Sequence, residues 1–130
     1  MTATALRRAC LAMPGAIEDF PFGPENSVFK VAGRIFAISP LHRSPPLRVS
    51  LKCEPALAEQ LRASHPAITP GYHLNKRHWN TIVLDGSLDD AMLRDLIEDS
   101  YALVAPRRMG DPGLEPGTSS LSEKRSNRLS

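Results

Sequence analysis

The sequence predicts one α+β domain, in which an antiparallel sheet of about five strands packs against helices in the order α-β-β-β-α-β-β-α. Two patterns predict this class. Apolar residues recur at helical spacing in three stretches of the first 105 residues, and they alternate with polar residues in the stretches between. Short connections that contain Gly or Pro separate the alternating stretches, as is typical of antiparallel neighbours.

Three stretches have the apolar stripe of an amphipathic helix: residues 5–13, 55–65 and about 88–104. Thr4 can cap the first helix, and Ser87 or Asp89 can cap the third. Pro55 suits the first turn of the middle helix, and Pro66 forces that helix to end. We expect the middle helix to cover the same sheet as the other two.

Four stretches are expected to form strands: residues 28–31, 34–38, 47–52 and 78–84. A further short strand or extended arm is expected at residues 72–74. Residues 47–52 give the clearest signal, because every second residue there is apolar. The alternation places the side chains of Arg48, Ser50 and Lys52 on the face of the sheet that points away from the core.

The domain is expected to span residues 1–105, and residues 106–130 are expected to form a disordered tail. The tail is rich in Gly, Pro and Ser, and it cannot bury enough apolar surface to offset the entropy of ordering. Residues 1–105 contain eleven Lys or Arg and eleven Asp or Glu, whereas residues 106–130 contain five and three. The excess positive charge therefore belongs to the tail, and the domain is net neutral.

Two cysteines, Cys10 and Cys53, are present, and Arg7 and Arg8 interrupt any apolar run of the kind found in a signal peptide. No stretch approaches the roughly 20 apolar residues that a membrane-spanning helix needs. We therefore expect a cytoplasmic protein with reduced thiols and no membrane partner.

The stretch from Pro70 to Asn80 is the expected site of any binding activity. It gathers two basic residues, two histidines, two amides and two aromatic residues before an apolar strand. Lys76 and Arg77 could bind phosphates of DNA. Four further side chains could form hydrogen bonds to phosphates or base edges: His73, Asn75, His78 and Asn80. Arg48 and Lys52 could add positive charge from the adjoining sheet. Composition alone favours an ordinary solvated turn, because a net-neutral domain lacks the overall field of a strong polyanion binder.

Enzymatic activity is not expected. The chain has no Walker A motif, no GxGxxG, no GxSxG and no HExxH. His73 and His78 lack the cysteine or carboxylate that would complete a zinc site, so no metal, cofactor or catalytic residue is assigned. An enzyme built on Glu18 and Asp19 together with these histidines is the least supported alternative. We expect residues 18–25 to form a solvated acidic loop that two phenylalanines hold to the core.

Several motifs, in this order, resemble the MmcQ/YjbR family of small bacterial proteins: Asp19-Phe20-Pro21-Phe22-Gly23, residues 28–37, Leu51-Lys52-Cys53 and the stretch from Pro70 to Asn80. The resemblance covers residues 5 to 104. It implies an α+β fold with an antiparallel sheet backed by helices, of the kind also seen in secretion chaperones. Members are commonly labelled DNA-binding, largely through a resemblance to double-wing transcription-factor domains. After residue 104 the tail replaces the closing segment that the family implies.

Two functional hypotheses follow from the sequence. The first is a cytoplasmic DNA-binding protein with a regulatory role, which contacts phosphates through the basic segment before the last strand. The second is a chaperone-like module that binds a protein or a small ligand and has no nucleic-acid activity.

Overall fold

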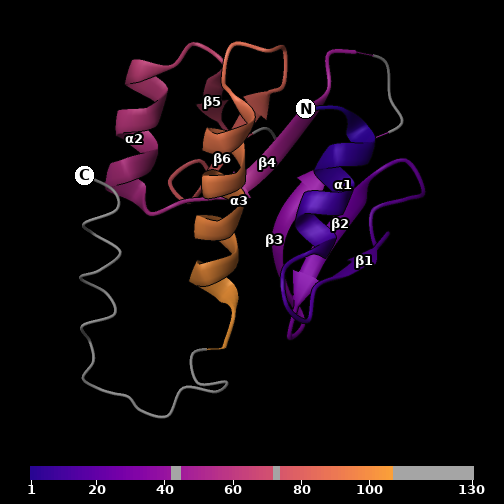
Figure 1. Ribbon diagram of the computed structural model, residues 1–130. Helices are drawn as coiled ribbons and strands as arrows, with labels where there is room; N and C mark the ends of the chain where they lie inside the picture. Colours follow the sequence, from indigo (N-terminus) through magenta and orange to yellow (C-terminus); the bar gives the residue numbers. More distant parts are fainter. Residues whose placement is uncertain (42–44, 72–73, 107–130) are drawn as a thin grey trace.

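The computed structural model describes residues 1–41, 45–71 and 74–106, and it confirms the predicted α+β class. The described chain contains three helices and one open sheet of six strands, one strand more than expected (Figure 1). Their bounds are α1 Ala3–Leu11, β1 Ile17–Asp19, β2 Ser27–Val31, β3 Arg34–Ser39, β4 Arg48–Lys52, α2 Pro55–Ser64, β5 Ile68–Pro70, β6 Trp79–Val83 and α3 Asp90–Val104. The predicted tail lies, except for its first residue, outside the described residues.

The strands are ordered β1-β2-β3-β4-β6-β5, and every neighbouring pair is antiparallel. Strand β1 was not expected from the sequence, since it is only three residues long and two of them are acidic. The expected strand at residues 72–74 falls largely outside the described residues, and the strand found nearby is β5, which ends at Pro70. The predicted hairpin between β2 and β3 is confirmed, with positive φ at both Ala32 and Gly33.

Caps and prolines explain where the helices start and end. The N-cap of α1 is Thr2 rather than Thr4, and its hydroxyl accepts a hydrogen bond from the Ala5 N–H. Glu54 caps α2 ahead of Pro55, and Asp89 caps α3 as expected. The longest helix, α3, has 15 residues, and within the described chain we find no helix of the length and apolarity that a membrane crossing requires.

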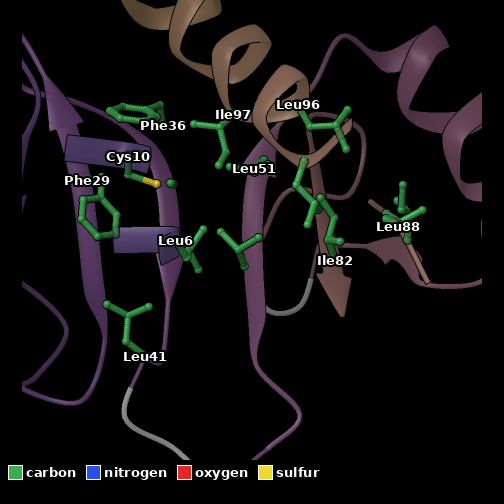
Figure 2. Close-up of a cluster of buried hydrophobic side chains, with 14 of the residues drawn as sticks. Leu6, Cys10, Phe29, Phe36, Leu41, Leu51, Ile82, Leu88, Leu96 and Ile97 are labelled. Atoms are coloured by element: carbon green, nitrogen blue, oxygen red, sulfur yellow. The ribbon is translucent and has the colours of Figure 1, made fainter. Parts of the chain in front are cut away.

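One apolar core lies between the helices and one face of the sheet. Figure 2 shows Leu6 and Cys10 of α1 near Phe29 of the sheet, and Ile97 of α3 above Leu51. The half-buried Leu61 of α2 packs against the same cluster, so all three helices cover this face. The opposite face, which we call the open face, carries alternate strand residues, among them Val28, Lys30, Ile35, Ile38, Arg48, Ser50, Lys52, Thr69, Trp79, Thr81 and Val83. Its middle, formed by Val28, Ser50 and Thr81, is buried.

The alternation expected in β4 is confirmed by the register of β4 with β6. Val49 and Leu51 are buried in the core, whereas Arg48 and Lys52 point to the open face. Ser50 also points there, but it is buried, and its hydroxyl lies 2.8 Å from the hydroxyl of its cross-strand neighbour Thr81.

The loop after β1 departs from expectation. Phe20 and Phe22 do not hold it to the core, because their side chains are 46% and 60% exposed. A turn closed by a hydrogen bond from the Gly23 N–H to the Phe20 carbonyl directs both rings outward. Together with Ile17, which is 56% exposed, they form an apolar surface at the β1 edge.

Strands β3 and β4 are joined by only two residue pairs, Ala37 with Leu51 and Ile38 with Ser50. A side chain from α3 adds hydrogen bonds to both strands. The buried Ser100 hydroxyl donates to the Phe36 carbonyl at 2.5 Å and accepts from the Lys52 N–H at 2.8 Å. Ser100 therefore satisfies one backbone group on each strand where the two strands separate.

Replacing Ser100 by Ala should destabilise the fold, because it leaves a buried carbonyl and a buried N–H without partners. At about 1–3 kcal/mol for each unsatisfied group, we expect the free energy of unfolding to fall by about 2–4 kcal/mol. Urea denaturation measures this loss. The control Ser64→Ala, at an exposed position of α2, should change stability by less than about 0.5 kcal/mol. Equal, small effects of both substitutions would contradict the bridging role.

Candidate nucleic-acid interface

The turn before β6 is closed by its own backbone. The Gly71 N–H donates to the Trp79 carbonyl at 2.8 Å, which extends the β5–β6 ladder by one pair. The N–H groups of His78 and Trp79 both donate to the Asn75 carbonyl, and the Arg77 N–H donates to the Asn75 side-chain oxygen at 2.9 Å. Asn75, a predicted DNA contact, therefore uses its amide oxygen to shape the turn.

Gly71 is required where the two ends of this turn approach each other. A Cβ atom at position 71 would lie 2.7 Å from Trp79 Cβ and 3.0 Å from the Trp79 carbonyl oxygen, closer than side chains can pack. The Gly71 carbonyl in turn accepts a hydrogen bond from Lys76 Nζ at 2.9 Å. Arg62 of α2 donates to the Lys76 carbonyl at 2.9 Å and ties the turn to that helix.

The predicted cations fall on two adjoining surfaces. Lys76 and Arg77 are exposed and line an open hollow of about 580 Å³ between the turn and the start of α2. The same hollow is lined by further side chains of mixed charge: Glu54, Glu59 and Arg62. Arg48 and Lys52 do not line it, and they lie on the open face of the sheet.

Trp79 belongs to the second of these surfaces. It is the first residue of β6, two positions after Arg77, and it pairs across the strands with Lys52. The Lys52 ammonium lies 5.9 Å from the centroid of the Trp79 ring, which is the geometry of a cation–π contact. The half-buried indole thus belongs to the open face, and it follows directly on the basic turn.

Asn80 corrects the predicted contact set. Its side chain is only 2% exposed and points to the core face opposite Leu51, so it cannot meet a ligand on the surface. Within the described parts of the chain, its amide oxygen and nitrogen meet no hydrogen-bond partner. The period of two places Asn80 on the same face as Ile82, and this signal was available in the sequence.

Of the two histidines in this stretch, the structure describes only His78. His78 is half-buried, and its carbonyl accepts a hydrogen bond of 2.7 Å from the Cys53 N–H at the end of β4. His73 lies outside the described residues. Over the ranges that the structure describes, we find no group of three or more His, Cys, Asp or Glu side chains arranged to hold a metal ion.

Charge on the open face is only partly neutralised. Hydrogen bonds from the Phe20 backbone and from Lys30 hold the pKa of Asp19 below its usual range, so Asp19 is ionised at neutral pH. Its carboxylate lies 3.1 Å from Lys30 Nζ and neutralises that cation. Among the described residues, Arg48 and Lys52 have no ion pair, so they leave net positive charge on this face.

Cys53, next to Lys52, is an inert thiol. Burial, with a smaller contribution from the negative charge of Asp99, raises the pKa of Cys53 to about 11. Cys10 in the core is buried as well, and its pKa is raised to about 12. Neither cysteine has the lowered pKa of a nucleophile.

Three contributors to these surfaces have no signal in the sequence. Arg62 and Glu59 lie on α2, and only the packing of α2 beside the turn brings them to Lys76. Lys30 reaches the open face with Asp19 because β1 pairs with β2, and β1 has no strand signal of its own.

Comparison with known proteins decides the family. The family model described as YjbR matches residues 11–103. The chain belongs to the YjbR family. Among its relatives, the uncharacterised protein YbdF of Escherichia coli O157:H7 is 41% identical over 98 residues, which cover 75% of this chain and 80% of YbdF. The uncharacterised protein YjbR of Escherichia coli K12 is 41% identical over 101 residues, which cover 78% of this chain and 85% of that protein.

Solved structures agree with the YjbR assignment. The crystal structure of Deinococcus radiodurans protein DR2400, with a DUF419 domain, matches with a TM-score of 0.75 and 39% identity over 94% of this chain and 86% of that one. A crystal structure from Pseudomonas syringae matches with a TM-score of 0.69 and 28% identity over 79% and 98%. The resemblance inferred from the motifs is therefore confirmed.

Replacing Gly71 by Ala should disrupt the turn of this YjbR-family chain, because the new methyl group collides with Trp79. We expect a loss of about 1–3 kcal/mol in the free energy of unfolding and a shifted Trp79 emission spectrum. Gly86→Ala is the control: it has positive φ and open space around the added methyl group, so it should cost only about 1 kcal/mol of backbone strain. A normal emission spectrum in Gly71→Ala would contradict the close approach.

Proposed function

We propose that the protein binds DNA through phosphate contacts from the basic turn and the adjoining open face. The observation that supports the proposal is the position of Trp79, whose ring centroid lies 5.9 Å from the Lys52 ammonium and which follows the exposed Lys76 and Arg77 closely in the chain. Arg48 extends the positive charge along β4. Arg48 and Lys52 are four positions apart along the strand, which corresponds to about 13 Å.

The side chains that support this proposal would bind phosphates, and phosphate contacts distinguish little between DNA sequences. Lysine and arginine side chains on phosphates fix position on DNA, whereas sequence is read at base edges. Of the side chains expected to hydrogen-bond to DNA, Asn80 is buried, and the amide oxygen of Asn75 already accepts from the Arg77 N–H. We therefore propose binding with low sequence preference in the bacterial cytoplasm, with any regulatory role following from occupancy of DNA. Binding without catalysis is part of the same proposal.

The double substitution Lys76→Ala/Arg77→Ala should weaken DNA binding about tenfold at low salt, since two phosphate contacts are lost. Each lost contact should also reduce the slope of log affinity against log salt by about 1. Fluorescence anisotropy with labelled DNA, repeated at salt concentrations from about 50 to about 200 mM, measures both effects.

The matched control is Arg8→Ala/Arg94→Ala, which removes the same charge from exposed positions on α1 and α3. Its affinity should stay within about twofold of the parent, because neither arginine lines the hollow beside the turn or lies on the open face. The proposal fails if the parent does not bind DNA at low salt, or if the turn variant binds as tightly as the parent.

A second candidate function has its own supporting observation. Ile17, Phe20 and Phe22 expose a cluster of large apolar side chains at the β1 edge, and clusters of this kind are typical of protein-binding surfaces. This arrangement favours the chaperone-like alternative, in which the chain binds a protein.

For this alternative, a pull-down with the full chain should return one stoichiometric protein that survives nuclease treatment. Phe20→Ser/Phe22→Ser should abolish its recovery and leave DNA affinity unchanged, because the rings lie away from the basic turn. Loss of the partner after nuclease treatment would show that DNA bridges the two proteins, and would count against direct binding.

A further inference from the structure

We propose that the DNA ligand is single-stranded and lies on the open face, with a base stacked on Trp79 and phosphates bound by Lys52 and Arg48. This inference rests on the proposed DNA-binding function and specifies its substrate. It is carried by the width of the sheet, by the position of the aromatic ring among the cations, and by the charge of the face.

The width of the open face disfavours a duplex. Six strands at the usual spacing of about 4.8 Å form a surface about 24 Å wide. The major groove of B-DNA is about 12 Å wide and admits a helix or a two-stranded ribbon. A sheet of this width can therefore touch a duplex only along its phosphates, whereas a single strand can place one base against Trp79 and its phosphates beside the accessible Lys52 and Arg48.

The composition of the open face matches the known physics of single-strand binding. Such surfaces combine cations that follow the backbone with aromatic rings on which bases stack. Trp79 lies between the basic turn and Lys52, and Arg48 lies further along β4. Exposed Thr69 on the neighbouring β5 adds a hydroxyl to the same face.

Trp79 is held in place before any ligand arrives. Its N–H donates to the Asn75 carbonyl, its carbonyl accepts from the Gly71 N–H, and its register with Lys52 is fixed by the β4–β6 ladder. A rigid aromatic side chain loses little conformational entropy when a base stacks on it. The close packing of Gly71 against Trp79 therefore preorganises the platform.

Lys52 can exchange its partner when a strand binds. In the free protein its ammonium lies over the Trp79 ring at 5.9 Å. An exposed cation–π contact is worth less than the stacking of a base on an aromatic ring, and a phosphate is a stronger partner for the ammonium than the ring is. When a strand binds, a base can thus stack on the Trp79 ring while the Lys52 ammonium moves to the adjacent phosphate.

Charge complementarity supports a polyanion on this face. The carboxylate of Asp19 is held by Lys30, and Lys52 and Arg48 have no carboxylate partner among the described residues. In the hollow beside α2, Glu54 and Glu59 repel a phosphate backbone, so we expect the strand to pass from Lys76 and Arg77 onto the open face and not into the hollow. The open face therefore offers the more favourable path for a phosphate backbone.

The only tryptophan of the chain makes the test direct. Trp79 emission is followed while oligo-dT or a duplex of equal length is added at low salt, and labelled DNA gives the affinities by anisotropy. We expect oligo-dT to quench the emission and to bind at least about tenfold more tightly than the duplex. Trp79→Leu should weaken oligo-dT binding about tenfold or more and leave duplex binding unchanged, and Trp79→Phe should retain most of the affinity.

A second variant keeps the test decisive if Trp79→Leu does not fold. Arg48→Gln/Lys52→Gln should reduce the salt slope for oligo-dT by about 1.4, corresponding to two phosphates on a single strand. Duplex binding as tight as oligo-dT binding, with unchanged Trp79 emission, overturns the single-strand inference and leaves the DNA-binding function standing. Failure of both ligands to bind overturns the function itself.

Discussion

The packing of α3 across β3 and β4 holds the two halves of the sheet together. Only two residue pairs join these strands, so the ladder alone gives a narrow connection between β1-β2-β3 and β4-β6-β5. Ser100 adds a hydrogen bond to each strand, and Phe36 meets Tyr101 edge-on with ring centroids 5.4 Å apart. The position of Lys52 and Trp79 relative to the rest of the sheet therefore depends on α3.

The placement of all three helices on one face determines what the other face can be. An antiparallel sheet covered on one side must present alternate residues to solvent on the other. In this chain those residues include Arg48, Lys52 and Trp79, and the sequence between β5 and β6 adds the basic turn beside them. The candidate interface thus arises from the same alternation that builds the core, and a rigid sheet carries most of it.

The sequence predicted the parts of the fold that depend on local patterns. The alternation in β4, Pro55 in the first turn of α2 and the Asp89 cap of α3 rest on residues close together in the chain, so they could be predicted directly. Strand β1 could not, because its two acidic residues have no strand preference and its pairing with β2 is set by tertiary contacts such as that of Glu18 with Arg7. For the site, Lys76 and Arg77 lie exposed in the turn, but the sequence could not show that they line a hollow with α2 while Arg48 lies on the open face of the sheet.

The buried amide of Asn80, which meets no partner among the described residues, affects the stability of the domain. A buried polar group without a partner lowers stability, and an apolar residue of similar size at this position would fit beside Leu51 and Ile82 at lower cost. Position 80 therefore carries a local cost in stability on the core side of β6, next in the chain to Trp79, whose ring points to the opposite face.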